Sequence, residues 1–172
     1  MNKLINHSLL LTFILCLTTA NAQVKKDKLE TAEQVIDNLY DMVSFYPGQD
    51  VNWDHVRSLF IKDAVIVLRT KRDETTIFSV DGFVDDFIQF IDRAQAKKTG
   101  FTEKIIRKKT VIMGDMAHIL VLYEAHIPGS TNPPQRGVDS FSLIKKDNRW
   151  WIISVTNEIP TLDVPVPPEL DK

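Results

Sequence analysis

The pattern of apolar and polar positions divides the chain into a helical first half and a strand-rich second half. From Leu29 to Tyr46, apolar residues recur at spacings of three and four, which places them on one face of a helix. Thr31 and Gln34 have the spacing of a capping box at its start. Similar spacings predict a short helix over residues 53–60 and a third helix that Asp81 caps.

β-Branched residues and alternation mark the strands. Two strands are predicted between the second and third helices, over residues 62–70 and 75–80. Four longer ones follow residue 100, at 101–113, 116–127, 138–146 and 149–158. Turn residues separate them, as in an antiparallel meander. We therefore expect an α+β domain in which three helices of the N-terminal half cover a strongly curved, mixed or antiparallel sheet.

The two ends of the chain differ in character from this domain. Residues 1–22 combine Lys3, a short apolar run and a terminal "ANA", which is typical of a signal peptide cleaved after Ala22. We expect a secreted or periplasmic protein without a membrane anchor after cleavage. The domain then spans residues 23–158, and the acidic, proline-rich residues 159–172 form a tail that cannot join a central strand.

Composition narrows the chemistry. The only cysteine, Cys16, lies in the predicted signal peptide, so the mature chain has no disulfide and no thiolate nucleophile or ligand. A formal net charge of −2 gives no sign of nucleic-acid binding. The basic cluster at 104–109 is interpreted as the solvated edge of a strand. Hydrolase, zinc-protease and nucleotide-binding motifs do not occur, and we expect no cofactor.

Two short motifs and the order of elements carry a family resemblance. An "F-x-x-D-A" junction at residues 60–64 leads into the first strand, and "RWWI" at 149–152 begins the last. With three early helices and four late strands, the chain resembles the nuclear transport factor 2-like superfamily. The resemblance implies a cone-shaped sheet around an apolar pocket, a scaffold that serves both enzymes and binding proteins, so fold alone does not give the activity.

Within that superfamily the closest enzymatic comparison is ketosteroid isomerase. Asp139 in "VDSF" matches the carboxylic acid of its strand motif, and Tyr40 lies near the position of its helix-1 tyrosine. The position of its catalytic base falls on Leu68, which cannot accept a proton. The comparison therefore disfavours the isomerase reaction but keeps a pocket in which Asp139 and Tyr40 hold a ligand.

Asp139 has two interpretations. Alternation places it with Phe141 on one face of its strand, among apolar residues. It then either contacts a ligand, as a carboxyl whose pKa is raised by burial, or pairs with Arg136.

Further candidates for the pocket wall lie on the predicted strands at 116–127 and 149–158. Glu124 and His126 share a predicted face and are expected at the pocket rim, with a metal site or a water-activating His126 as alternatives. On the last strand, the isomerase comparison points Ile153 and Asn157 into the pocket.

The sequence thus predicts a domain that binds a small apolar or mixed-polarity molecule through Tyr40, Leu68, Glu124, Asp139, Phe141, Ile153 and Asn157. A lyase or isomerase that uses Asp139, Tyr40 and His126 is the first alternative. A non-enzymatic interaction module is the second. A homodimer is expected in which the outer faces of two sheets meet.

Overall fold

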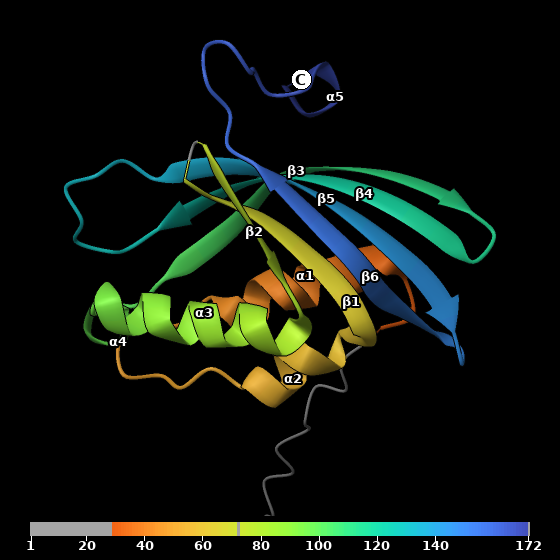
Figure 1. The fold of residues 1–172 in the computed structure, drawn as a ribbon, viewed down its shortest axis with the longest axis horizontal. Helices are drawn as coiled ribbons and strands as arrows, with labels where there is room; N and C mark the ends of the chain where they lie inside the picture. The colour runs from red at the N-terminus through yellow and green to blue at the C-terminus, as the bar shows by residue number, and fades with distance from the viewer. Residues whose placement is uncertain (1–28, 72, 172) are drawn as a thin grey trace, which may run out of the picture.

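A six-stranded, curved sheet carries helices α1 to α4 on one face and α5 on the other (Figure 1). The computed structural model describes residues 29–71 and 73–171, so the predicted signal peptide lies outside the described residues. The helices are α1 (Ala32–Val43), α2 (Trp53–Ser58), α3 (Val80–Arg93), α4 (Ala96–Thr99) and α5 (Pro168–Asp171). The strands are β1 (Phe60–Lys71), β2 (Glu74–Phe78), β3 (Thr102–Met113), β4 (Met116–His126), β5 (Gln135–Lys146) and β6 (Arg149–Glu158). The predicted α+β class is confirmed.

The sheet is mixed. Its strand order is β2-β1-β6-β5-β4-β3. Strands β1 and β6 are parallel, and every other neighbouring pair is antiparallel. The parallel pair joins the strand that leaves the early helices to the last strand of the meander. As a result, residues far apart in the sequence meet on one concave face.

Side-chain caps fix where the two long helices begin. At α1, the Thr31 hydroxyl accepts from the Gln34 backbone and the Gln34 side chain accepts from the Thr31 backbone, which confirms the predicted capping box. Asp81, however, is not the cap of α3. Ser79 takes this position, because its hydroxyl accepts from the N–H of Gly82, and Asp81 lies in the first turn.

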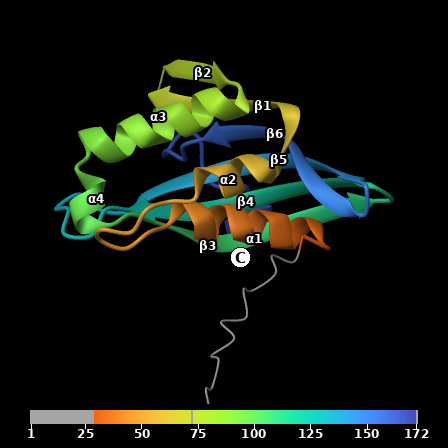
Figure 2. The ribbon, with the colours of Figure 1, turned by 90° about the horizontal axis from the view of Figure 1, so that it is seen from below.

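Helices α1 to α4 form one layer on the concave face of the sheet (Figure 2). Helix α1 packs against β3 and β6, while α3 packs against β1 and β2. Ile36 of α1, Val84 of α3 and Ile119 of β4 are completely buried in this layer. Because α1 and α3 meet the sheet at different strands, the region between them is left for the cavity described below.

The start of β3 is fastened to the segment after α1. Phe45 and Phe101 exchange two backbone hydrogen bonds, with N to O distances of 2.8 and 3.0 Å. Gly100 comes before this bridge with a φ of 84°, and a Cβ there would lie 2.8 Å from the Phe45 carbonyl oxygen. Only glycine combines this backbone conformation with so close an approach.

A β-bulge interrupts the alternation of β6. Ser142 of β5 pairs with Ser154, but the next residue, Leu143, pairs with Ile152. Ile153 is therefore an extra residue between two pairs. Both Ile152 and Val155 are buried on the concave face, although strict alternation would place them on opposite faces.

After β6, the chain crosses to the convex face of the sheet (Figure 1). It ends in α5, which contacts β3 and β4. Leu170 of α5 is 1% exposed, although Leu162 earlier in the same segment is fully exposed. The proline-rich tail thus runs outside the sheet, anchored at its end. Among the described residues, no helix has the length and apolar character needed to cross a membrane.

Candidate functional site

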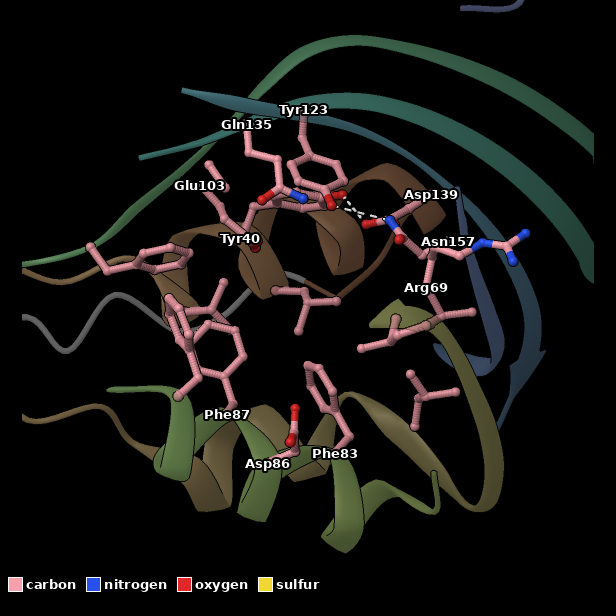
Figure 3. Close-up of a pocket in the computed structure, with 18 of the residues that line it drawn as sticks. Tyr40, Arg69, Phe83, Asp86, Phe87, Glu103, Tyr123, Gln135, Asp139 and Asn157 are labelled. Atoms are coloured by element: carbon pink, nitrogen blue, oxygen red, sulfur yellow. Dashed lines mark hydrogen bonds between the residues drawn. The ribbon is translucent and has the colours of Figure 1, made fainter. Parts of the chain in front are cut away.

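A cavity of about 690 Å³ lies between the sheet, α1 and α3. Figure 3 shows its two kinds of wall. Polar side chains from α1 and strands β3 to β6 line one side, and aromatic rings from α3 line the other. This volume is within the range of pockets that bind small organic molecules.

A hydrogen-bonded network forms the polar wall. Tyr40 of α1 donates from Oη to Oδ2 of Asp139 at 2.6 Å. Asn157 of β6 donates from Nδ2 to Oδ1 of Asp139 at 2.7 Å and lies 3.1 Å from Tyr123 Oη. Asp139 and Asn157 are directly paired across β5 and β6, and Tyr123 is on the next strand. The predicted residues Tyr40, Asp139 and Asn157 are therefore brought together.

Asp139 has an unusual protonation equilibrium for an aspartate. Removal from water raises its pKa to about 6, although the hydrogen bonds from Tyr40 and Asn157 act in the opposite direction. Burial, followed by the field of Asp139, also raises the pKa of the Tyr40 hydroxyl well above its usual value. The network therefore has a carboxyl that changes charge near neutral pH beside a tyrosine that keeps its proton.

The alternative partner of Asp139 is excluded by the structure. Arg136 lies 3.7 Å from Glu124, not beside Asp139. The two partners are directly opposite each other on β4 and β5. A position three residues from Asp139 falls on the other face of the strand, because side chains alternate. Asp139 is a pocket residue and not half of that ion pair.

Glu103 of β3 is a second acidic residue in the polar wall of the cavity, and it is not among the residues predicted from the sequence. Burial and then the charge of Asp139 raise the pKa of its carboxyl to about 8. Its side chain forms no hydrogen bond or ion pair with any part of the chain that the structure describes. Alternation with the partly buried Ile105 was the available signal, but the adjoining lysines and arginine led to the interpretation of a solvated edge.

The backbone of Glu103 is held at the end of α1. Its N–H donates to Ser44 Oγ at 2.8 Å. The Ser44 hydroxyl lies within hydrogen-bond distance of both the Tyr40 and Glu103 carbonyl oxygens, at 2.9 and 3.2 Å. Together with the bridge between Phe45 and Phe101, this contact fixes Glu103 and Tyr40 on the same side of the cavity, as Figure 3 shows.

Aromatic rings form the opposite wall. Phe83 and Phe87 of α3 point toward the polar network across the cavity (Figure 3). Their ring centroids are 6.0 Å apart in an edge-on arrangement, and Phe87 packs in the same way on Phe101. Such edge-to-face contacts hold the rings in defined orientations. The cavity therefore presents a fixed apolar surface to a ligand.

Of the remaining residues predicted from the sequence, some line the cavity and others lie outside it. Leu68, Phe141 and His126 line the cavity, as expected. No hydrogen bond joins His126 to the network of Tyr40 and Asp139 in the described residues.

Glu124 and Ile153 do not line it, so their predicted positions were wrong. Glu124 alternates with Tyr123 and Ala125, which face inward, and it pairs with Arg136 outside. Ile153 is the bulged residue and is 38% exposed. In the residues that the structure describes, no group of three His, Cys, Asp or Glu side chains is arranged to hold a metal ion.

No protein-family model and no curated protein matches the sequence of this chain.

Several solved structures share its fold. A nuclear transport factor 2-like (NTF2-like) protein with a cystatin-like fold from Novosphingobium aromaticivorans has a TM-score of 0.61 and 12% identity, with 80% of this chain and 86% of that chain covered. An NTF2-like protein of unknown function from Pseudomonas putida has a TM-score of 0.59 and 11% identity, with coverage of 81% and 92%.

A third similar structure is a provisionally assigned scytalone dehydratase from Novosphingobium aromaticivorans. Its TM-score is 0.56 at 10% identity, and the alignment covers 75% of this chain and 81% of that chain. These similarities confirm the predicted nuclear transport factor 2-like fold. At such low identity they show the fold and leave the activity to the residues of the site.

Proposed function

We propose that this chain, which has the nuclear transport factor 2-like fold, binds a small organic molecule in the cavity between α1, α3 and the sheet. The cavity itself carries the proposal, because a space of about 690 Å³ with one aromatic and one hydrogen-bonding wall suits a ligand of mixed polarity. The network of Tyr40, Asp139 and Asn157 would orient a polar group of the ligand. Leu68, Phe141 and the rings of α3 would contact its apolar part.

The experiment that tests this proposal is mass spectrometry of small molecules that co-purify with the mature protein. A matched pair of variants locates any bound molecule. Ala125→Phe fills the cavity, since Ala125 lines it, whereas Ser140→Phe adds the same ring to β5 outside the cavity. We expect the bound molecule to be lost in Ala125→Phe and kept in Ser140→Phe. Equal retention by both folded variants would contradict binding in this cavity.

A lyase or isomerase reaction is the second candidate. It is supported by the Asp139 carboxyl, whose pKa of about 6 suits proton transfer near neutral pH, beside the Tyr40 hydroxyl at 2.6 Å. The similar fold of the provisionally assigned dehydratase is an analogy in the same direction. If the co-purifying molecule is converted on incubation, Asp139→Asn should abolish the conversion. Unchanged conversion by this variant would exclude Asp139 as the proton-transfer group.

Residues 1–22 are the basis for a proposal about where the protein acts. We propose that this segment directs export and that the mature chain begins at Gln23, outside the cytoplasm. N-terminal sequencing of the protein recovered from the periplasm or medium of an expressing bacterium would test the cleavage position. Recovery of the uncut chain from the cytoplasm alone would contradict it.

A further inference from the structure

The polar wall of the cavity holds two carboxyl groups, and the described part of the chain gives hydrogen-bond donors to only one of them. Tyr40 donates to Asp139, and Asn157 reaches both Asp139 and Tyr123, so these donors are already engaged. Glu103 has none among the described residues. A carboxyl group removed from water without a donor or a cation is unfavourable when charged. Glu103 therefore stays protonated at neutral pH in the empty site, and a positive or hydrogen-bond-donating partner is needed for both carboxyl groups to be charged together.

The cations of the cavity do not meet this need. Arg69 forms an ion pair with Glu158 at 2.6 Å, and Arg93 lies 3.5 Å from the Gln89 side chain. Neither forms an ion pair with Glu103 or Asp139. The titratable and charged groups that line the two hollows around Glu103 are Asp37, Tyr40 and Asp41 of α1, Arg69 of β1, Glu74 of β2, Asp86 and Arg93 of α3, Lys104 of β3, Tyr123 and His126 of β4, and Asp139 of β5.

The aromatic wall faces these acids across the cavity. Figure 3 shows Phe83 and Phe87 opposite the polar wall, with Asp86 between them on α3. Aromatic rings accommodate the apolar body that an organic cation carries. An inorganic cation would lose the benefit of this wall.

We infer that the cavity binds an organic amine, with its protonated nitrogen between the carboxylates of Glu103 and Asp139 and its apolar body against Phe83 and Phe87. The inference rests on the proposed binding function and adds the chemical class of the ligand. The ammonium group supplies the missing donors and the positive charge together. Binding then ionises Glu103, and the released proton goes to the solvent.

The release of this proton makes the binding affinity depend on pH. Glu103, with a pKa of about 8, keeps its proton in the empty site at neutral pH, whereas Asp139, with a pKa of about 6, is mostly charged. Between about pH 6 and about pH 8 an amine must displace one proton, that of Glu103, so its affinity rises over this range by up to about tenfold for each pH unit. A neutral ligand that accepts a hydrogen bond from the protonated carboxyl shows the opposite trend.

The experiment compares phenethylamine with 2-phenylethanol, a neutral probe of similar shape, by isothermal titration calorimetry on the mature chain. We expect the amine to bind at least about tenfold more tightly at pH 8, which corresponds to the loss of one charge-assisted contact. Titrations in two buffers of different ionisation enthalpy should show release of about one proton at pH 7. This measurement needs no variant.

Two variants assign the effect. Glu103→Gln should weaken amine binding about tenfold or more and remove its pH dependence between about pH 6 and about pH 8. Asp85→Asn changes an exposed acid of α3 that does not line the cavity, and it should keep both.

The inference is overturned if the alcohol binds as tightly as the amine, if no proton is released, or if a folded Glu103→Gln variant keeps the pH dependence. Binding of the alcohol alone, or a co-purifying molecule without a basic nitrogen, overturns the amine inference and leaves the binding function standing. Absence of binding by both probes, together with no co-purifying molecule, overturns both.

Discussion

The ring of Tyr123 lies directly over Gly137, its partner on the neighbouring strand. A Cβ added at Gly137 would come within 2.2 Å of Tyr123 Oη and within 2.5 Å of two of its ring carbons. The absence of a side chain on β5 therefore lets the tyrosine lie flat against the sheet with its hydroxyl 3.1 Å from Asn157 Nδ2. One glycine sets the position of one side of the polar wall.

We predict that Gly137→Ala displaces Tyr123. It should lower the free energy of unfolding by about 1–3 kcal/mol, because an added methyl group has no room in a packed region. Urea denaturation measures this change. Gly82→Ala is the matched control, since a Cβ there meets only ordinary contacts of 3.4 Å or more in a helix, and it should be neutral or stabilising.

A double variant checks the cause. In a Tyr123→Ala background, Gly137→Ala should cost much less than it does alone, because the ring that it would strike is gone. An equal cost in both backgrounds would show that the glycine is needed for another reason.

The hydrogen bond from Tyr40 to Asp139 should be visible in the titration of the carboxyl. In Tyr40→Phe we predict that the pKa of Asp139 rises above its value of about 6, because a donor that favours the charged form is lost while burial is kept. The free energy of unfolding should fall by about 1–2 kcal/mol. Carbon-detected NMR of the carboxyl against pH measures the first effect, and chemical denaturation measures the second.

Tyr46→Phe is the control for this change. Tyr46 is 78% exposed and does not line the cavity, so its hydroxyl should affect neither quantity. An Asp139 pKa that is the same in Tyr40→Phe and in the parent would mean that the 2.6 Å hydrogen bond does not persist in solution.

Glu103 should make the chain less stable as the pH rises from 4.5 to about 8. Its pKa is about 8 in the folded chain and 4.5 in a freely solvated one, so the folded state binds the proton more tightly. Stability is then lost as pH rises through this range, by up to about 1.4 kcal/mol for each pH unit. Asp139 contributes a loss of the same sign between 3.8 and about 6.

We predict that Glu103→Gln removes the Glu103 part of this loss. The variant should match the parent near pH 4.5 and be more stable at pH 8, as measured by urea denaturation across the range. An exposed acid such as Asp85 should give no such divergence when changed to Asn. If the parent were instead the more stable protein at pH 8, the charged carboxylate would have to be well solvated or paired.

Much of this architecture is readable from the sequence because it depends on local patterns. The Thr31 capping box, the turn at Asp147 and Asn148, and alternation in β4 each act over a few residues. Asp139 and Tyr40 were also found, through residue types in a family-like order. The distances between them could not be known, since 99 residues separate the partners.

The errors have identifiable physical causes. The isomerase comparison predicts Ile153 in the pocket because alternation puts it on the face of Asn157, and the bulge breaks that alternation by one residue. Glu103 was missed because its neighbours are basic, and only the cover provided by α1 makes that part of an edge strand an inner wall. Both depend on tertiary contacts that no single segment encodes.

The bulge decides which of two adjacent isoleucines is buried. Ile152 is fully buried and Ile153 is 38% exposed on the other face. We predict that Ile152→Lys prevents folding or costs more than about 3 kcal/mol, because it buries an unpaired charge, while Ile153→Lys stays within about 0.5 kcal/mol of the parent. Circular dichroism and thermal melts of the two variants suffice. The reverse order, with Ile153→Lys the costlier change, would indicate that strict alternation holds and that the bulge is absent.

Leu170 should hold the end of the tail against the convex face of the sheet. Leu170 is 1% exposed where α5 meets β3 and β4, and Leu122 of β4 is equally buried although its neighbours Val121 and Tyr123 face the other way. Leu170→Ala should cost about 2 kcal/mol and speed proteolysis of residues 159–172, because its apolar anchor is removed. Leu162→Ala, at a fully exposed position of the same tail, should change neither. Equal protease sensitivity of the parent and Leu170→Ala would show that α5 does not stay docked, and the convex face would then be free along β3 and β4.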